Sequence, residues 1–140
     1  MSLESDTNLQ IHIDDSLLQE LASAAWKSRE NAYVIGPTKV GCAVLGSGGK
    51  IFAGCNIEHR FRSHDIHAEV NAISTMVANG CKSISVILIA AERDRFTPCG
   101  ACMDWIMQFG TADTLVLFQG KRNGEIQRYT SAQLMPYYPA

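Results

Sequence analysis

The sequence predicts an α/β fold, specifically a three-layer α/β/α sandwich in which helices cover both faces of a mixed five-stranded sheet. Short apolar runs of strand length alternate along the chain with segments whose apolar residues recur every three or four positions, as in sheets with helices on both sides. The 140 residues, 46% of them hydrophobic and 19% charged, suit one hydrophobic core and are too few for two. Residues 1–12 show no periodicity, so we expect a flexible N-terminal leader followed by a single domain over 13–140.

The first half of this domain reads as a helix followed by a hairpin. From Asp14 onward, leucines and alanines recur at helical spacing behind an Asp-Asp pair suited to capping the helix. Gly36 and Pro37 mark the loop that follows. Two short apolar runs, 40–45 and 51–55, flank the segment GSGGK, whose glycines supply the positive φ angles that a tight hairpin needs.

The second half alternates helices and strands. Apolar residues from Ile66 to Val77 predict a helix that ends at Asn79-Gly80, a pair suited to a left-handed C-terminal cap. The elements expected after it are a buried strand over 85–91, a helix that follows Pro98 and runs to Phe109, strands over 114–119 and 126–130, and a short helix over 131–135.

Charge and hydropathy exclude several classes of function. The net charge of −2, without a long run of one sign, gives no basic field to attract a nucleic acid polymer. No window approaches the roughly 18 consecutive apolar residues of a membrane span, and the N-terminus lacks the basic-then-apolar layout of a secretory signal. We therefore expect a cytoplasmic protein, and a nucleic acid polymer is disfavoured as its substrate.

Five cysteines are present, and only two of them have a chemically informative spacing. Cys42, Cys55 and Cys81 stand alone, as free thiols of the core or loops do. Cys99 and Cys102 lie three residues apart at a predicted helix start, where one turn lets both sulfurs face one ion and free N–H groups favour the thiolate. This pair alone fits a zinc site and a redox dithiol equally well.

His67 and Glu69 favour the zinc interpretation. A neutral imidazole at a second helix start completes a set of three protein ligands, which leaves a fourth position for water. Glu69, two residues on, can place its carboxylate beside that water as a general acid and base. A structural alternative stays open, because His64 together with these three ligands would make a closed site without a catalytic water.

The spacing His67-x-Glu69 followed by Pro-Cys99-x-x-Cys102 is the signature of zinc-dependent nucleobase deaminases. Four segments in order, VGCAVL, GCNIE, HAEVNAI and TPCGACMDWI, resemble the cytidine deaminase family from about Lys39 to Phe109. The resemblance implies one zinc per subunit, on His67, Cys99 and Cys102, with Glu69 as the proton carrier. It also implies substrate contacts at Asn56, Glu58 and Ala68, and a homo-oligomer, a tetramer or a dimer, whose sites borrow residues across subunits.

Two departures from the family pattern bear on charge and substrate. Many relatives have three cysteine ligands and an arginine after the catalytic glutamate, whereas this chain has His67 and Val70, so two thiolates balance Zn²⁺. Where the family has an aromatic residue that stacks on the base, this chain has the segment 37–39, Pro-Thr-Lys. Arg60 and Arg62 either belong to a solvated loop or contact an anionic group of the substrate.

The resulting hypothesis is hydrolytic deamination of a cytosine nucleoside, cytidine, deoxycytidine or a close analogue, to the uracil form with release of ammonia. A first alternative is a deaminase of a different substrate, such as a nucleoside antibiotic of the blasticidin S type, a nucleotide, or a purine or pterin base. A second alternative is a non-catalytic module that zinc stabilises.

Overall fold

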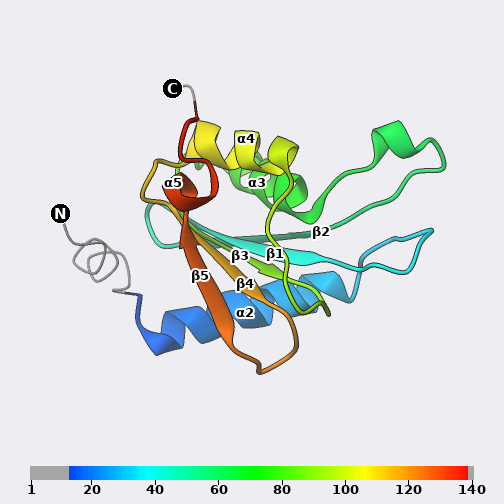
Figure 1. Ribbon diagram of the computed structural model, residues 1–140, viewed down its shortest axis with the longest axis horizontal. Coiled ribbons are helices and arrows are strands. Elements are labelled where there is room, and N and C mark those ends of the chain that lie inside the picture. Colours follow the sequence, from blue (N-terminus) through cyan, green and yellow to red (C-terminus); the bar gives the residue numbers. More distant parts are fainter. Residues whose placement is uncertain (1–12, 139–140) are drawn as a thin grey trace.

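The computed structural model describes residues 13–138, which form a sheet with helices on both faces (Figure 1). The strand order is β2-β1-β3-β4-β5, with β3 and β4 parallel and the other neighbours antiparallel, so the sheet is mixed as predicted. The strands are β1 (Gly41–Gly46), β2 (Ile51–Cys55), β3 (Ile84–Ala90), β4 (Leu115–Gln119) and β5 (Ile126–Thr130).

Helices occupy the two faces of the sheet unequally, with α2 on one face and α3 and α4 on the other (Figure 1). This arrangement confirms the three-layer prediction. The helices are α2 (Asp15–Arg29), the single 3₁₀ turn η1 (Arg62–His64), α3 (Ala68–Ala78), α4 (Gly100–Phe109) and α5 (Ser131–Leu134). None of the helices within 13–138 is both long and apolar enough to cross a membrane.

Helix α2 begins at a capped residue and packs closely on β1. The Asp14 carboxylate accepts a hydrogen bond from the Leu17 N–H at 2.7 Å, which satisfies one of the free donors of the first turn. The buried leucines of α2 pack against alternate residues of β1, β3 and β4. A side chain at Gly41 would overlap the Ala25 carbonyl and the backbone of Arg29, so only glycine allows this approach.

The hairpin between β1 and β2 follows the sequence prediction. Gly48 and Gly49 have φ angles of 95° and 89°, the left-handed region that favours glycine. On the far side of β2, a side chain at Gly54 would overlap the backbone of α3 at Asn71 and Ala72. Helix α3 therefore lies directly against β2, which fixes the position of its first turn.

Several strand ends meet at one edge of the sheet. Gly41, at the start of β1, pairs with Cys55 at the end of β2 and with Ala90 at the end of β3. Because β3 and β4 are parallel, the chain crosses over from β3 to β4 through α4. The first residues after β3 therefore lie at this same edge. Ligands of α/β proteins bind beyond the carboxyl ends of such strands.

The region before α3 differs from the prediction. The helix begins at Ala68, with His67 as its N-cap, and Ile66 is not helical. Ile57 and Ile66 instead exchange backbone hydrogen bonds of 2.8 and 2.9 Å, and this isolated bridge closes a loop that contains η1. The predicted leader, residues 1–12, lies outside the described residues, so the proposed domain boundary stays a prediction.

Candidate active site

The three predicted metal ligands come from two helix starts and lie together. His67 is the N-cap residue of α3, Cys99 is the N-cap residue of α4, and Cys102 is in the first turn of α4. The His67 Nδ1 atom lies 3.2 Å from the Cys102 Sγ and 3.5 Å from the Cys99 Sγ. All three ligand atoms are within 4.8 Å of one another, close enough to bind one metal ion.

The chemistry of this donor set fits zinc. Imidazole and two thiols are zinc ligands, and three protein ligands are typical of a catalytic rather than a structural site. Burial, with a smaller contribution from the Glu69 carboxylate, raises the pKa of Cys102 well above its ordinary value. A bound divalent cation supplies the positive charge that a thiolate needs at this position. His67 and Cys99 are exposed while Cys102 is buried, so the cluster is open on one side.

His64 does not belong to this cluster. It lies in η1, where its ring packs edge-on against His59 with the ring centroids 5.0 Å apart. Among residues 13–138, the group that could hold a metal ion comprises the three predicted ligands alone. The closed four-ligand site is therefore not formed.

Glu69 lies in the first turn of α3 and is only 2% exposed. Burial raises the pKa of its carboxyl group, and this effect is opposed in part by a backbone hydrogen bond, His67 and Cys102. A buried carboxyl group with a raised pKa beside a metal-binding site is suited to taking up and releasing protons. Glu69 is thus in the position expected of a general acid and base.

A cavity of about 280 Å³ lies at the edge of the sheet where the strand ends meet, and Glu69 and two of the metal ligands face it. Seven predicted site residues line this cavity: Asn56, Glu58, Arg62, His67, Ala68, Glu69 and Cys99. Cys102 lies beneath it as the buried member of the metal cluster, and Arg60 is exposed outside its lining. Three of the sequence motifs, GCNIE, HAEVNAI and TPCGACMDWI, are therefore brought to one place.

Asn56 shapes the wall of the cavity through two hydrogen bonds. Its Oδ1 atom accepts a hydrogen bond from the Val40 N–H at 2.9 Å, and its Nδ2 atom donates to the Thr38 carbonyl at 2.9 Å. This side chain therefore holds the segment before β1, where the sequence lacks the family's aromatic residue, against the end of β2.

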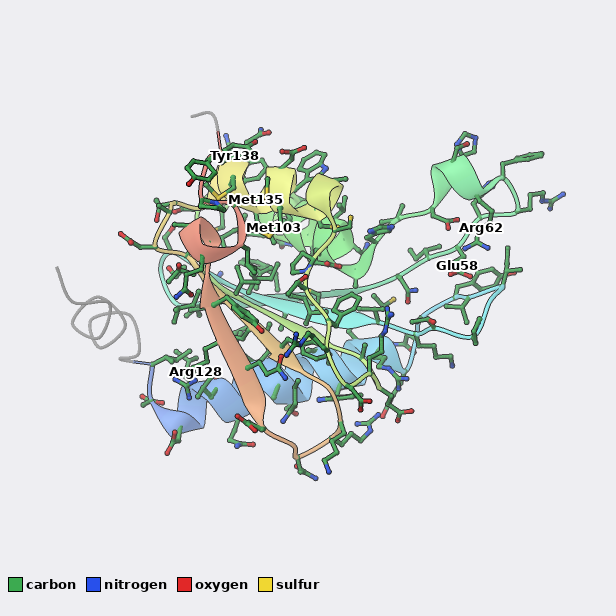
Figure 2. All side chains as sticks on the ribbon, in the orientation of Figure 1. Glu58, Arg62, Met103, Arg128, Met135 and Tyr138 are labelled. Carbon is green, nitrogen blue, oxygen red and sulfur yellow. The ribbon has the colours of Figure 1, made fainter. Side chains whose placement is uncertain are left out.

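Glu58 is held by backbone donors on one side and by arginine on the other. Its Oε1 atom accepts hydrogen bonds from the Ile35 and Gly36 N–H groups at 2.7 and 2.9 Å, and these bonds are the main reason that its pKa is lowered. Its Oε2 atom lies 3.1 Å from the Arg62 guanidinium (Figure 2). The same guanidinium also pairs with Asp65 at 2.9 Å. The charge of Arg62 is therefore compensated within this chain.

Comparison with known proteins identifies the family. Residues 15–118 match the family model described as the cytidine and deoxycytidylate deaminase zinc-binding region. This chain belongs to the cytidine and deoxycytidylate deaminase family. As a member it is a zinc-dependent aminohydrolase, which removes the redox dithiol and the non-catalytic module from consideration.

Two curated relatives and one solved structure illustrate how much of this deaminase they share. The cytidine deaminase of Sporosarcina psychrophila is 32% identical over 121 residues, which are 85% of this chain and 88% of the relative. That of Halalkalibacterium halodurans is 33% identical over 120 residues, 84% of this chain and 90% of the relative. The crystal structure of cytidine deaminase from Burkholderia pseudomallei covers 85% of this chain and 96% of its own, with a TM-score of 0.77 and 28% identity.

Sequence reasoning missed half of the cavity wall of this deaminase. The additional lining residues are Thr38, Val40, Asp65, Ile66, Arg93, Phe96 and Thr97. Arg93, Phe96 and Thr97 come from the segment between β3 and α4. The sequence did carry a signal, because an aromatic residue in a run of charged residues stands three positions before Cys99.

Proposed function

We propose that this protein deaminates a cytosine nucleoside, such as cytidine or deoxycytidine, to the corresponding uracil nucleoside and ammonia. The observation that supports this function most directly is the buried Glu69 carboxyl group beside the three metal ligands, with Glu69, His67 and Cys99 lining one cavity. The relatives of similar length named cytidine deaminase support this substrate class.

The metal site would supply the nucleophile of the reaction. His67, Cys99 and Cys102 would hold one zinc ion. When bound, zinc lowers the pKa of water toward neutrality and so provides a nucleophile at ordinary pH.

Glu69 moves the protons. Its carboxylate takes a proton from the attacking water and passes it to the ring nitrogen next to the carbon that bears the amino group. It then carries the second proton of that water, from the hydroxyl group now on the ring carbon, to the departing amine. The C–N bond breaks as the carbonyl forms, so water and the aminopyrimidine become the carbonyl product and ammonia. Because burial raises the pKa of Glu69, its carboxyl group can hold the proton between the two transfers.

Substrate contacts follow from the cavity wall. We assign Asn56 and Glu58 to the ribose hydroxyl groups and the backbone around Ala68 to the base, since all three line the cavity. Arg62 acts on Glu58 by holding its carboxylate. Arg60, which lies outside the lining, has no structural support as a substrate contact.

The protein is proposed to be a cytoplasmic homo-oligomer, a tetramer or a dimer, that works in pyrimidine salvage. The loop that contains η1 stands away from the sheet (Figure 1), and it and the neighbouring loop expose Tyr33, Ile35 and Phe61 at 68%, 58% and 63%. Large apolar side chains gathered on one surface are typical of a subunit interface. Light scattering on the zinc-loaded protein should give a mass of two or four chains, and a monomer at micromolar concentration would contradict the assembly.

The test of the activity is ammonia release by the zinc-loaded protein from cytidine, deoxycytidine, their monophosphates, blasticidin-type nucleosides, guanine and adenosine. At least one cytosine nucleoside is expected to react. The Glu69→Gln variant should keep its zinc and lose roughly 10²- to 10⁴-fold in rate, because general acid and base catalysis contributes that much. Turnover by Glu69→Gln at the rate of the parent protein would rule out this mechanism.

A further inference from the structure

The cavity contains a second arginine, Arg93, in the segment between β3 and α4. Its backbone N–H donates to the carbonyls of Ala91 and Gly120 at 3.0 and 3.1 Å, immediately beyond the ends of β3 and β4. A side chain at Gly120 would overlap the Arg93 carbonyl, so the two segments are in close contact. The backbone of Arg93 is therefore fixed to the sheet although its side chain is exposed.

The Arg93 side chain lies on an aromatic platform. Its guanidinium carbon is 5.2 Å from the centroid of the Phe96 ring, within the range of a cation–π contact. The Phe96 ring in turn packs on Phe118, with centroids 5.4 Å apart, and Phe118 is a buried residue of β4. The contact through Phe96 orients the guanidinium at the cavity without using any of its N–H donors.

The two arginines that line the cavity, Arg62 and Arg93, differ in their ion pairs. Arg62 is compensated by Glu58 and Asp65. Within residues 13–138, no ion pair joins Arg93 to a carboxylate. An oriented guanidinium with free donors and no counter-ion is a site for a carboxylate or a phosphate, which it binds through two parallel hydrogen bonds.

We propose that Arg93 binds an anionic group of the substrate, so that the preferred substrate is a cytosine nucleoside bearing a phosphate or a carboxylate on its sugar. The inference rests on the proposed function, because the aminopyrimidine ring must reach Glu69. That ring is uncharged at neutral pH, and the anion must therefore belong to the remainder of the molecule. Arg93 is thus a specificity-determining residue.

Product binding tests this proposal without turnover. Dissociation constants of the zinc-loaded protein are measured by calorimetry for uridine, uridine 5′-monophosphate and uridine 5′-carboxylate. The parent protein should bind one or both anionic compounds roughly ten- to hundredfold more tightly than uridine, with an advantage that falls as salt rises. The two anionic arms distinguish a phosphate from a carboxylate substrate.

Variants of Arg93 test whether this residue causes the preference for anionic compounds. Arg93→Gln should abolish it, so that the anionic compounds bind no more tightly than uridine does, while Arg93→Lys should keep part of it through its charge. Arg95→Gln is the matched control, because Arg95 is an exposed residue of the same segment outside the cavity lining and the change in net charge is the same. Equal affinity for neutral and anionic compounds in the parent protein, or a preference that survives Arg93→Gln, would overturn the proposal.

Ammonia release from cytidine and its 5′-monophosphate distinguishes failure of the proposed deaminase activity from failure of the proposed anion site at Arg93. If neither compound reacts but the anion preference depends on Arg93, the proposed activity fails and the anion site stands. If both react at the same kcat/KM in the parent protein and in Arg93→Gln, the activity stands and Arg93 only packs on Phe96. A salt-sensitive preference in the parent protein supports the site even if Arg93→Gln does not fold.

Discussion

The Glu58 carboxylate connects three segments of the chain. It accepts hydrogen bonds from the backbone at Ile35 and Gly36 and pairs with Arg62 of η1. The Asn56 side chain connects the end of β2 to the segment that enters β1, through hydrogen bonds with the backbone of Val40 and Thr38. The resemblance to the family pointed to these residues as substrate contacts, and the structure adds that they hold the loops around the cavity.

Replacing Glu58 should therefore change stability in a pH-dependent way. Its folded-state pKa lies below the ordinary value of 4.5, so its stabilising effect is present above that pH and is lost as pH falls through the folded-state pKa. Urea unfolding should show Glu58→Gln to be less stable than the parent protein at pH 7, with a difference that shrinks as pH falls below 4.5. The same change at Glu20, exposed on α2, should have little effect at either pH. A constant difference at all pH values would contradict this explanation.

A second residue-scale prediction concerns Cys102. Cys102→Ser should weaken zinc binding by at least ~100-fold, since loss of a ligand exceeds the cost of losing an outer-shell partner. Metal analysis after dialysis measures this directly. Cys81→Ser is the control, because Cys81 is a free thiol that lies outside the metal cluster. Equal zinc content in the two variants would remove Cys102 from the ligand set.

At the scale of elements, two helix starts supply the chemistry. The N-cap positions of α3 and α4 carry His67 and Cys99, and the first turns carry Glu69 and Cys102. The sequence predicted both helices, because periodic apolar residues and the Asn79-Gly80 end are local features. It did not predict the bridge between Ile57 and Ile66, because a pair of single residues leaves no periodic pattern.

The contact between α2 and β1 gives a prediction at this scale. Gly41→Ala should destabilise the fold by about 1–3 kcal/mol, because the added carbon would push α2 away from the sheet. Gly100→Ala, at the start of α4, should be neutral or slightly stabilising, since nothing lies within 4 Å of the added carbon. Thermal unfolding of the two variants checks this, and equal melting temperatures would show that α2 adapts without cost.

For the whole molecule, the sheet brings the site together. The start of β1 and the ends of β2 and β3 meet at one edge, and the parallel crossover from β3 to β4 places the start of α4 there. The alternation of elements was sufficient to predict the layers, and the spacing of the motif residues was sufficient to predict the metal cluster. Arg93 and Phe96 were not predicted, because an aromatic residue among charged residues before Cys99 is a weak signal and not a motif. Only the tertiary arrangement brings their segment to the cavity.

Zinc should stabilise the whole fold, because its ligands join α3 to α4. Binding adds about 2.7 kcal/mol when free zinc is 100 times its dissociation constant. Chelation should therefore lower the melting temperature of the parent protein, and added zinc should restore it. Cys102→Ser should respond to neither treatment. An unchanged melting temperature of the parent protein after verified removal of zinc would refute this link.

The hydrogen bonds of Asn56 and Glu58 have a consequence for redesigning the substrate range. Two of the loops around the cavity are tied to each other through these side chains, so a substitution in either loop disturbs the other. The Arg93 side chain, by contrast, touches Phe96 of its own segment and forms no ion pair within residues 13–138. Libraries aimed at new substrates should therefore vary position 93 first and leave positions 56 and 58 unchanged.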